Sequence, residues 1–423
     1  MTDYYRIPAV IGASLNFGVN GTAYVPFFTA DYGSITNTTE ANVQVKHQIA
    51  SKLKNLRLYV SSNAATVTTT VKTRINGADG QNSVSISAGA TGWFEDTTNT
   101  DDIAAGDKIC YSLSKADANT VVIKNLVTDV LATSAYQKGG YYVNGTTLST
   151  ASTARYFPFG GSVNNTTEGI DQKRRIRSSC TGKNLQVYVS SNPRSTTTTV
   201  RSRVNGADGN QVISISASAT GWFEDTSNTD TLVQDDDYCA SITTGTGSGS
   251  LVVQHVSADI QGTTSTSIAA GPSGGTLSTN QTRYWSPTGG MAGTAESTEA
   301  NASIKFRGTG TISKLAVGAS VNGSDQTTTY TARKNASDQT PTCTIAASTT
   351  GFGSDNSNTF TYADGDLIAV KGARASGGTG TIATTWIAFE LAPDAESIGG
   401  GGGGVFTPYY NLFLQNLGSG YNV

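Results

Sequence analysis

The residues best suited to chemistry gather in the segment TGWFEDTTNTDD, Thr91 to Asp102, which joins an aromatic pair to several carboxylates. Trp93 could stack on a sugar ring while neighbouring carboxylates accept hydrogen bonds from the sugar hydroxyls. The same oxygens could instead bind Ca²⁺, which prefers several hard oxygen ligands. A third interpretation is structural, because Asp and Asn side chains cap their own turns and large aromatic groups fill cores and interfaces.

Related segments, TGWFEDTSNTD from Thr220 and TGFGSDNSNT from Thr350, allow these interpretations to be compared. Trp222 repeats Trp93, and Phe352 keeps an aromatic group at that position, whereas most carboxylates are absent from the third segment. The spacing matches no EF-hand loop. We therefore favour packing and expect no metal and no cofactor, with Ca²⁺ as the weaker alternative. Trp93 and Trp222 remain candidates for a glycan platform.

Other groups that could support catalysis are few. The two histidines, His47 and His255, have no motif partner such as HxxxE or GxSxG. GTGSGS, Gly245 to Ser250, lacks the Lys-Ser/Thr pair of a phosphate loop. The basic cluster KRRIR, Lys173 to Arg177, occurs in one copy only and suits a solvated face or a salt-bridged subunit contact. We predict a protein that is not an enzyme and has no catalytic residue.

The elements that position these residues repeat about every 130 residues. Each copy contains a tyrosine near a proline, a short TEA or TEG segment, alternating strand patterns and then the segment described above. Turn signals such as NGADG at Asn76 to Gly80 separate the strands. Seven or eight strands are expected in each copy, and helix is nearly absent. The fold class is therefore all-β, with three tandem antiparallel β-sandwich domains of jelly-roll type.

The segments outside the three copies are expected to be arms and linkers. The predicted division is an N-terminal docking arm (1–21), repeat 1 (22–132), a linker (133–153), repeat 2 (154–262), a linker (263–281), repeat 3 (282–392), a glycine-rich linker (393–404) and a C-terminal apolar docking peptide (405–423). Large apolar groups at a free end would be a liability in water, which suggests that they dock on a partner. The candidate docking residues are Tyr4, Tyr5, Phe406, Tyr409, Tyr410, Leu412, Phe413 and Leu414.

Composition limits the partners. The formal net charge of −3 gives no large basic field, so nucleic-acid binding is not expected. No apolar run approaches the roughly 20 residues that span a bilayer, and the first residues lack the pattern of a secretory signal, so we expect assembly in a cytoplasm without membrane insertion. The four cysteines suit buried free thiols better than a disulfide framework.

The repeated pattern VNGADG, VSISAGATGWFEDTTNTDD and AGDKI resembles segments of structural proteins from tailed bacteriophages, of the head decoration, head fibre and tail fibre types. The layout is also similar to tumour-necrosis-factor-like modules, which commonly trimerise. The resemblance implies a virion structural protein with jelly-roll modules, present on the virion surface, bound to other capsid or tail proteins and forming a homo-oligomer such as a trimer. A receptor-recognition fibre or adhesin that binds host surface glycans is the alternative. The sequence does not choose between a pseudo-trimer and a linear stack of its three domains.

Overall fold

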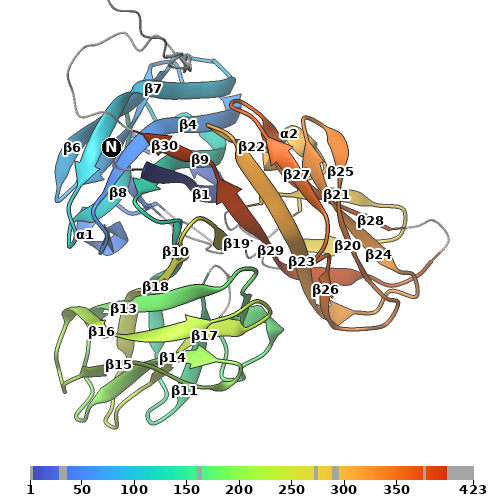
Figure 1. Cartoon of the computed structure of the whole chain (residues 1–423). Coiled ribbons are helices and arrows are strands. Elements are labelled where there is room, and N and C mark those ends of the chain that lie inside the picture. The colour runs from blue at the N-terminus through green and yellow to red at the C-terminus, as the bar shows by residue number, and fades with distance from the viewer. Residues whose placement is uncertain are drawn as a thin grey trace, which may run out of the picture.

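Figure 1 shows a computed structural model of the chain, in which three β-domains surround a common centre and each domain contacts the other two. The structure describes residues 3–27, 36–159, 164–270, 275–287, 295–374 and 378–397. The fold is all-β, with antiparallel sheets in every domain and helices of at most four residues in the described part of the chain.

The first domain consists of two antiparallel sheets packed face to face. Its elements are β1 (Asp3–Phe17), β2 (Gly21–Pro26), α1 (Glu40–Val43), β3 (Val45–Lys46), β4 (Ser51–Asn63), β5 (Thr69–Ile75), β6 (Ala78–Ile86), β7 (Gly92–Ile103), β8 (Lys108–Lys115) and β9 (Val121–Ala132). One sheet has the order β1-β9-β4-β7 and the other has the order β2-β8-β5-β6. The first strand thus pairs with the last, the second with the next to last, and so on inward. This nested pairing is that of a jelly roll.

The second domain repeats this topology. Its elements are β10 (Tyr136–Leu148), β11 (Ala154–Pro158), η1 (Ile170–Gln172), β12 (Arg174–Arg175), β13 (Cys180–Ser191), β14 (Thr198–Val204), β15 (Ala207–Ile215), β16 (Gly221–Leu232), β17 (Asp237–Thr243) and β18 (Leu251–Gln261). The sheet orders are β10-β18-β13-β16 and β11-β17-β14-β15, which match those of the first domain strand for strand.

The third domain has the same plan, but the counterparts of β1 and β7 are each divided into two pieces, β19 with β20 and β26 with β27. Its elements are β19 (Thr266–Ala270), β20 (Gly275–Leu277), β21 (Thr282–Trp285), α2 (Glu299–Ala302), β22 (Ile304–Lys305), β23 (Gly310–Asn322), β24 (Thr328–Lys334), β25 (Ser337–Ile345), β26 (Gly351–Ser354), β27 (Thr359–Tyr362), β28 (Leu367–Arg374) and β29 (Ile382–Pro393). A last strand, β30 (Ala395–Ser397), leaves this domain and pairs with β1 of the first domain, beside which Figure 1 shows it in red.

The predicted limits of the domains are corrected by these strands. β1 lies in the segment predicted as a docking arm, and β10 and β19 lie in the segments predicted as linkers. Each is the first strand of its jelly roll and pairs with the last strand, more than 100 residues further along the chain. Sequence patterns report local periodicity, and such a distant pairing leaves no local signal.

The predicted Asn-Gly turns, between β5 and β6 and between β14 and β15, are confirmed. Asn76 and Gly77 both have positive φ, 51° and 86°, as a two-residue hairpin turn requires. The third copy lacks the glycine, yet Asn335 and Ala336 adopt the same conformation with φ of 50° and 63°. Alanine is strained there, so the third copy retains the turn at an energetic cost.

Each domain encloses its own apolar core between the two sheets. In the first domain the core includes Leu58 on one sheet, Val71 on the other, and Phe94 packed against them. Phe223 has the same place in the second domain. Strand alternation therefore directs the phenylalanine of each WF pair inward and the tryptophan outward, away from the sandwich core.

Candidate functional site

The three domains meet through three matched junctions, and the first feature of each junction is a short basic segment. Equivalent positions are held by His47, Ile176 and Phe306. Each donates its backbone N–H to the carbonyl of the aspartate that directly precedes β8, β17 or β28, at 2.7, 2.8 and 2.8 Å. The flanking residues of this position are Lys46 and Gln48, Arg175 and Arg177, and Lys305 and Arg307. Each copy thus presents a basic residue, a spacer, and a residue with a long polar side chain that donates hydrogen bonds.

The second feature is the outward aromatic residue of the sixth strand. Trp93 lies directly opposite Tyr59, and Trp222 lies opposite Tyr188, in equivalent registers of β7 on β4 and β16 on β13. The rings of the second pair are stacked with centroids 5.2 Å apart. In the third domain, Phe352 occupies this position. The aromatic residue and the acidic or polar groups beside it form the surface that receives the basic segment of another domain.

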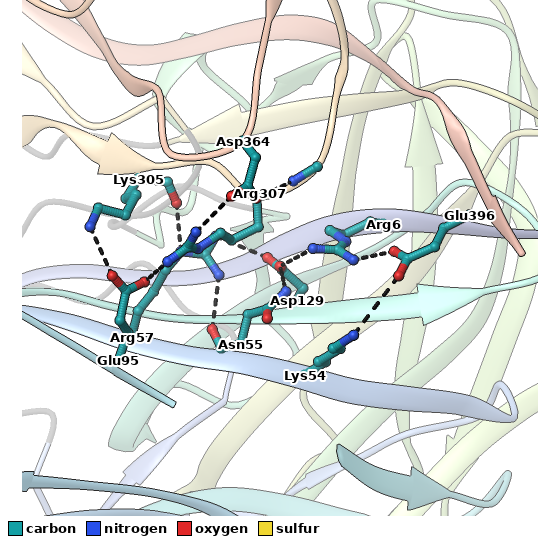
Figure 2. A network of polar contacts seen from close by, with 11 residues as sticks. Arg6, Lys54, Asn55, Arg57, Glu95, Asp129, Lys305, Arg307, Asp364 and Glu396 are labelled. Atoms are coloured by element: carbon teal, nitrogen blue, oxygen red, sulfur yellow. Dashed lines mark hydrogen bonds and ion pairs between the residues drawn. The ribbon is translucent and has the colours of Figure 1, made fainter. Parts of the chain in front are cut away.

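The junction between the third and first domains is shown in Figure 2. Lys305 Nζ lies 2.9 Å from Glu95 Oε1 and 5.5 Å from the centre of the Trp93 ring. Arg307 pairs with the other oxygen of Glu95 and with Asp364, the latter at 2.8 Å. The two cations hold the pKa of the Glu95 carboxyl below its ordinary value against the opposing effect of burial. The junction therefore combines ion pairs with a cation–π contact.

A buried ion pair lies behind this surface. Arg57 Nε donates to the carbonyl of Lys305 at 2.5 Å, and Arg57 Nη2 lies 2.9 Å from Asp129 Oδ1. Asp129 also accepts from Asn55 Nδ2 at 2.8 Å and lies 3.7 Å from Arg6 of β1. The guanidinium thus links a backbone carbonyl of the third domain to a buried carboxylate of the first.

β30 extends the same network. Arg6 forms an ion pair with Glu396, and Lys54 Nζ lies 3.9 Å from the other oxygen of Glu396. The strand that follows the third domain is thereby fixed to the first domain by backbone pairing and by charge. The two ends of the three-domain array are joined.

The junction between the first and second domains uses the equivalent residues. Lys46 Nζ lies 2.7 Å from Glu224 Oε1, and Gln48 donates to the other oxygen of Glu224. His47, between them, is buried and meets the ring of Tyr136 edge-on with centroids 5.3 Å apart. The basic segment of the first domain thus contacts the surface beside Trp222.

The junction between the second and third domains includes the KRRIR cluster. The Arg175 guanidinium lies 4.3 Å from the centre of the Phe352 ring. Arg177 Nε donates to the carbonyl of Lys314 at 2.7 Å, and its Nη2 donates to Asn356. The ion pairs of this cluster, with Asp235 and Asp237, lie within the second domain. Its contacts with the third domain are a cation–π contact and hydrogen bonds, so the cluster is a contact between two domains of one chain without an ion pair across it among the described residues.

The short helices follow the same cyclic order. α1 of the first domain packs on β18 of the second, η1 of the second on β23 and β29 of the third, and α2 of the third on β9 of the first. Asn125 of β9 donates to the carbonyls of Asn301 and Ser303 at 3.2 and 2.9 Å. Every domain therefore contacts the next domain through its short helix and the preceding domain through its last strand. Such a head-to-tail contact that returns to its start is a closed ring, and the three domains form a pseudo-trimer rather than a linear stack.

The carboxylates of the opening segment are engaged by other groups of the protein. Glu95 and Asp102 form ion pairs, and Asp101 accepts hydrogen bonds from β5 and β6. Asp96 accepts from Ser83 N at 2.9 Å and from Asn99 Nδ2 at 2.8 Å, and Asp225 and Asp355 make the equivalent contacts. For Asp355, burial acts to raise the carboxyl pKa, but hydrogen bonds from Asn358 and nearby backbone N–H groups outweigh it and lower the pKa to about 2. N–H donors thus occupy oxygens that a Ca²⁺ ion would need. Among the described residues, no group of three or more His, Cys, Asp or Glu side chains is placed to hold a metal ion.

The predicted docking and platform residues are placed as follows. Tyr4 and Tyr5 lie in β1, opposite Glu396 and Ala395 of β30. Trp93 and Trp222 are half-buried beside the junctions. The other predicted docking residues, Phe406, Tyr409, Tyr410, Leu412, Phe413 and Leu414, lie outside the described residues.

Two further sequence predictions concern cysteines and membranes. All four cysteines are free and buried, as predicted, and burial raises the pKa of the Cys180 and Cys343 thiols to about 12. These thiols are therefore packed rather than reactive. No helix in the described ranges is long and apolar enough to cross a membrane.

Apart from the KRRIR cluster, the junction residues were not predicted from the sequence, although a signal was available. A basic residue, one intervening residue and then Gln or Arg recur in all three copies as KHQ, RIR and KFR. The intervening residue varies among His, Ile and Phe, which hides the repeat when residues are compared one at a time.

Comparisons with known proteins add one likeness. No family model matches the chain, and no curated protein matches it. A solved structure described as the triple jelly roll fold and turret assembly of an archaeal virus aligns with 90% of this chain and 91% of its own, with 14% identity and a TM-score of 0.18. A TM-score this low does not establish a shared arrangement of domains.

Proposed function

We propose that this chain is a non-enzymatic structural component of a viral particle, of the capsid decoration or fibre type, which works as a closed ring of three jelly rolls. The observation that carries the proposal is the cyclic set of junctions, in which Lys46, Arg175 and Lys305 each contact the aromatic or acidic surface of the next domain. Rigid β-domains arranged in this way provide an extended surface for assembly. The resemblance of the repeated segments to tailed-phage structural proteins supports the same role.

Ring closure also bears on the expected oligomer. Each domain uses its basic segment on one neighbour and its aromatic surface on the other, so neither surface remains for a second chain. One chain therefore takes the place of the expected homotrimer of single jelly rolls. Further self-association would need surfaces outside the three junctions.

The chemistry of the site supports an assembly role over catalysis. The repeated carboxylates accept hydrogen bonds within their own domain or pair with cations of a neighbouring domain. His47 and His255 are both buried, and burial lowers their pKa to about 4 and about 3. Neutral buried imidazoles without access to solvent are poorly suited to proton transfer with a substrate.

The proposed partners are other virion proteins on the surface of the particle, and the proposed attachment is the apolar segment 405–423, which lies outside the described residues. A glycan platform on the tryptophans has less support, because the Lys305 ammonium occupies a position over the Trp93 ring and Trp222 packs on Tyr188.

Two measurements test this proposal. Light scattering after gel filtration should give the mass of one chain, and virus particles assembled with a chain lacking residues 399–423 should lose the protein while full-length chains are incorporated. A stable trimer whose chains join one another through the junction surfaces would contradict the closed-ring proposal. Incorporation of the truncated chain at the full-length level would contradict the attachment proposal.

A further inference from the structure

The second domain carries a hollow of about 700 Å³ that the junctions do not use. It lies between the start of β13 and the end of β16. The segments 133–135, before β10, and 262–265, after β18, border it. Its volume is in the range of small-molecule sites. Hydroxyl groups dominate its polar lining: Ser134, Ser179, Thr181, Thr229, Thr231 and Thr263.

A lysine without a partner lines this hollow. Lys183 precedes Asn184, which has a φ of 54°, and Lys54 of the first domain precedes Asn55, which has a φ of 58°, so the two lysines hold matched positions. Lys54 lies 3.9 Å from Glu396. Lys183 forms no side-chain hydrogen bond or ion pair with any described residue. The second domain therefore lacks a counterpart of the carboxylate that β30 places beside Lys54.

Two positions beside this lysine also carry charged side chains in the first domain and uncharged ones in the second. In the first domain, Lys52 lies opposite Asp102 and pairs with it. In the second domain, Thr181 lies opposite Thr231, and both hydroxyls line the hollow. An ion pair at the surface of the first domain is thus replaced in the second domain by two small uncharged side chains, which line the hollow.

A second cation without an acidic partner lies in β12, which shortly precedes the lining residues at the start of β13. Arg174 is 2% exposed, and its only hydrogen bonds among the described residues go to Gln137 and the carbonyl of Ser267, both from Nη2, while Nε and Nη1 have no partner. A buried guanidinium without a counterion is costly, and an anion nearby would offset that cost.

The lining residues themselves include no carboxylate. The Asp236 carboxylate, near this wall, is engaged in its own turn: it accepts from Val233 N at 2.8 Å and from Asn205 Nδ2 at 2.7 Å. Asp259, which lies opposite Lys183 where β13 pairs with β18, is engaged by Lys138 at 2.8 Å. Lys183 is therefore the only charged residue among those that line the hollow, and most of the polar groups around it are hydroxyls.

We propose that this hollow binds an acidic saccharide, with its carboxylate or sulfate group on Lys183 and its hydroxyl groups on the surrounding Ser and Thr side chains. The ligand supplies the negative charge that Glu396 supplies beside Lys54. The site belongs to the second domain alone, because the third domain has Ser313 at the position of Lys183, and this serine donates to Glu390 at 3.1 Å.

The test uses the full-length protein with sialyllactose as the probe, and saturation-transfer NMR and calorimetry as the measurements. Sialyllactose should bind, neutral lactose should bind at least about tenfold more weakly, and added salt should weaken the binding, because a charge-assisted contact is lost or screened. Lys183→Met should weaken sialyllactose binding about tenfold or more, whereas Lys54→Met, at the matched position of the first domain, should leave it unchanged.

A second variant separates binding from folding. Thr181→Lys combined with Thr231→Asp reproduces the ion pair of the first domain, and it should fill the hollow and abolish binding while the protein remains folded. The proposal is overturned if sialyllactose does not bind, if lactose binds equally well, or if the filled variant binds normally. Sulfate alone competing as strongly as the sugar acid would also overturn it, because the site would then recognise an inorganic anion only. None of these outcomes affects the mass and incorporation tests of the assembly role.

Discussion

Arg57 Nη2 lies 2.9 Å from Asp129 Oδ1, and the two side chains are 0% and 1% exposed. The pair lies between the first and third domains, where Arg57 also donates to the carbonyl of Lys305. A charge this deeply buried depends on its partner, because water cannot replace it.

Arg57→Met should therefore lower the free energy of unfolding by about 3 kcal/mol or more, since it leaves Asp129 buried with weaker compensation. Urea denaturation is the measurement. Lys52→Met is the matched control, because its partner Asp102 is 83% exposed and such surface pairs contribute about 0–1 kcal/mol. Equal effects of the two substitutions would contradict a special role for the buried pair.

Trp93→Ala should loosen the junction between the first and third domains. The substitution removes the ring near Lys305 and the packing against Tyr59, with centroids 5.6 Å apart, and we expect a loss on the order of 2 kcal/mol. Hydrogen exchange should increase in β22 and α2, which belong to the opposite domain. Unchanged stability and exchange, together with loss of glycan binding, would instead support the platform interpretation of this tryptophan.

Both histidines of the chain lie where the first and second domains meet: His47 lies against Tyr136 of β10, and His255, which lies beside Trp222, is on β18, the strand that α1 contacts. They should make this junction sensitive to acid. His47 Nε2 lies 2.8 Å from Ser51 Oγ, whereas neither ring nitrogen of His255, on β18, has a hydrogen-bond partner among the described residues. Burial is the main cause that lowers their pKa to about 4 and about 3, and the charge of Lys138 acts in the same direction on both.

The sign of the effect follows from proton binding. An unfolded histidine has a pKa of about 6.5, so between that value and the native pKa the unfolded state binds more protons. Stability therefore falls as the pH drops from about 6.5 toward 4 for His47 and toward 3 for His255. At pH near 4.5 each histidine should lower the free energy of unfolding by on the order of 2 kcal/mol.

Matched substitutions within the chain provide the control for this pH effect. His47→Ile introduces the residue of the equivalent position in the second copy, Ile176, and His255→Asn introduces that of the first copy, Asn125. The double variant should lose much less stability than the parent protein between pH 7 and pH 4.5 in urea titrations. The same loss in both proteins would show that carboxylates, not these histidines, set the acid response.

Asp96→Ala should destabilise the first domain by about 1–3 kcal/mol, because it leaves the N–H groups of Ser83 and Asn99 without their acceptor. Asp102→Ala, at an exposed carboxylate of the same strand, should have a much smaller effect. Thermal unfolding measures both. The midpoint of the parent protein should not change with added Ca²⁺ or with a chelator, and a clear upward shift with Ca²⁺ would instead favour the metal interpretation of these carboxylates.

The sequence by itself determined the local features of this protein. Period-two alternation, the Asn-Gly turns and the long repeat predict three all-β sandwiches, because strand periodicity and turn chemistry are written in consecutive residues. The retained aromatic position and the loss of carboxylates from the third copy also indicate that TGWFEDTTNTDD is a structural segment. The capping role of Asp96 and Asp355 agrees with that interpretation.

Only the tertiary structure decided how these parts are joined. The first strand of each jelly roll pairs with the last, so β1, β10 and β19 could not be separated from arms and linkers by local pattern. The ring depends on pairs such as Lys46 with Glu224 and Lys305 with Glu95, which are 178 and 210 residues apart. A charge on a strand surface has the same sequence pattern whether it faces water or another domain, and only the folded arrangement supplies its partner.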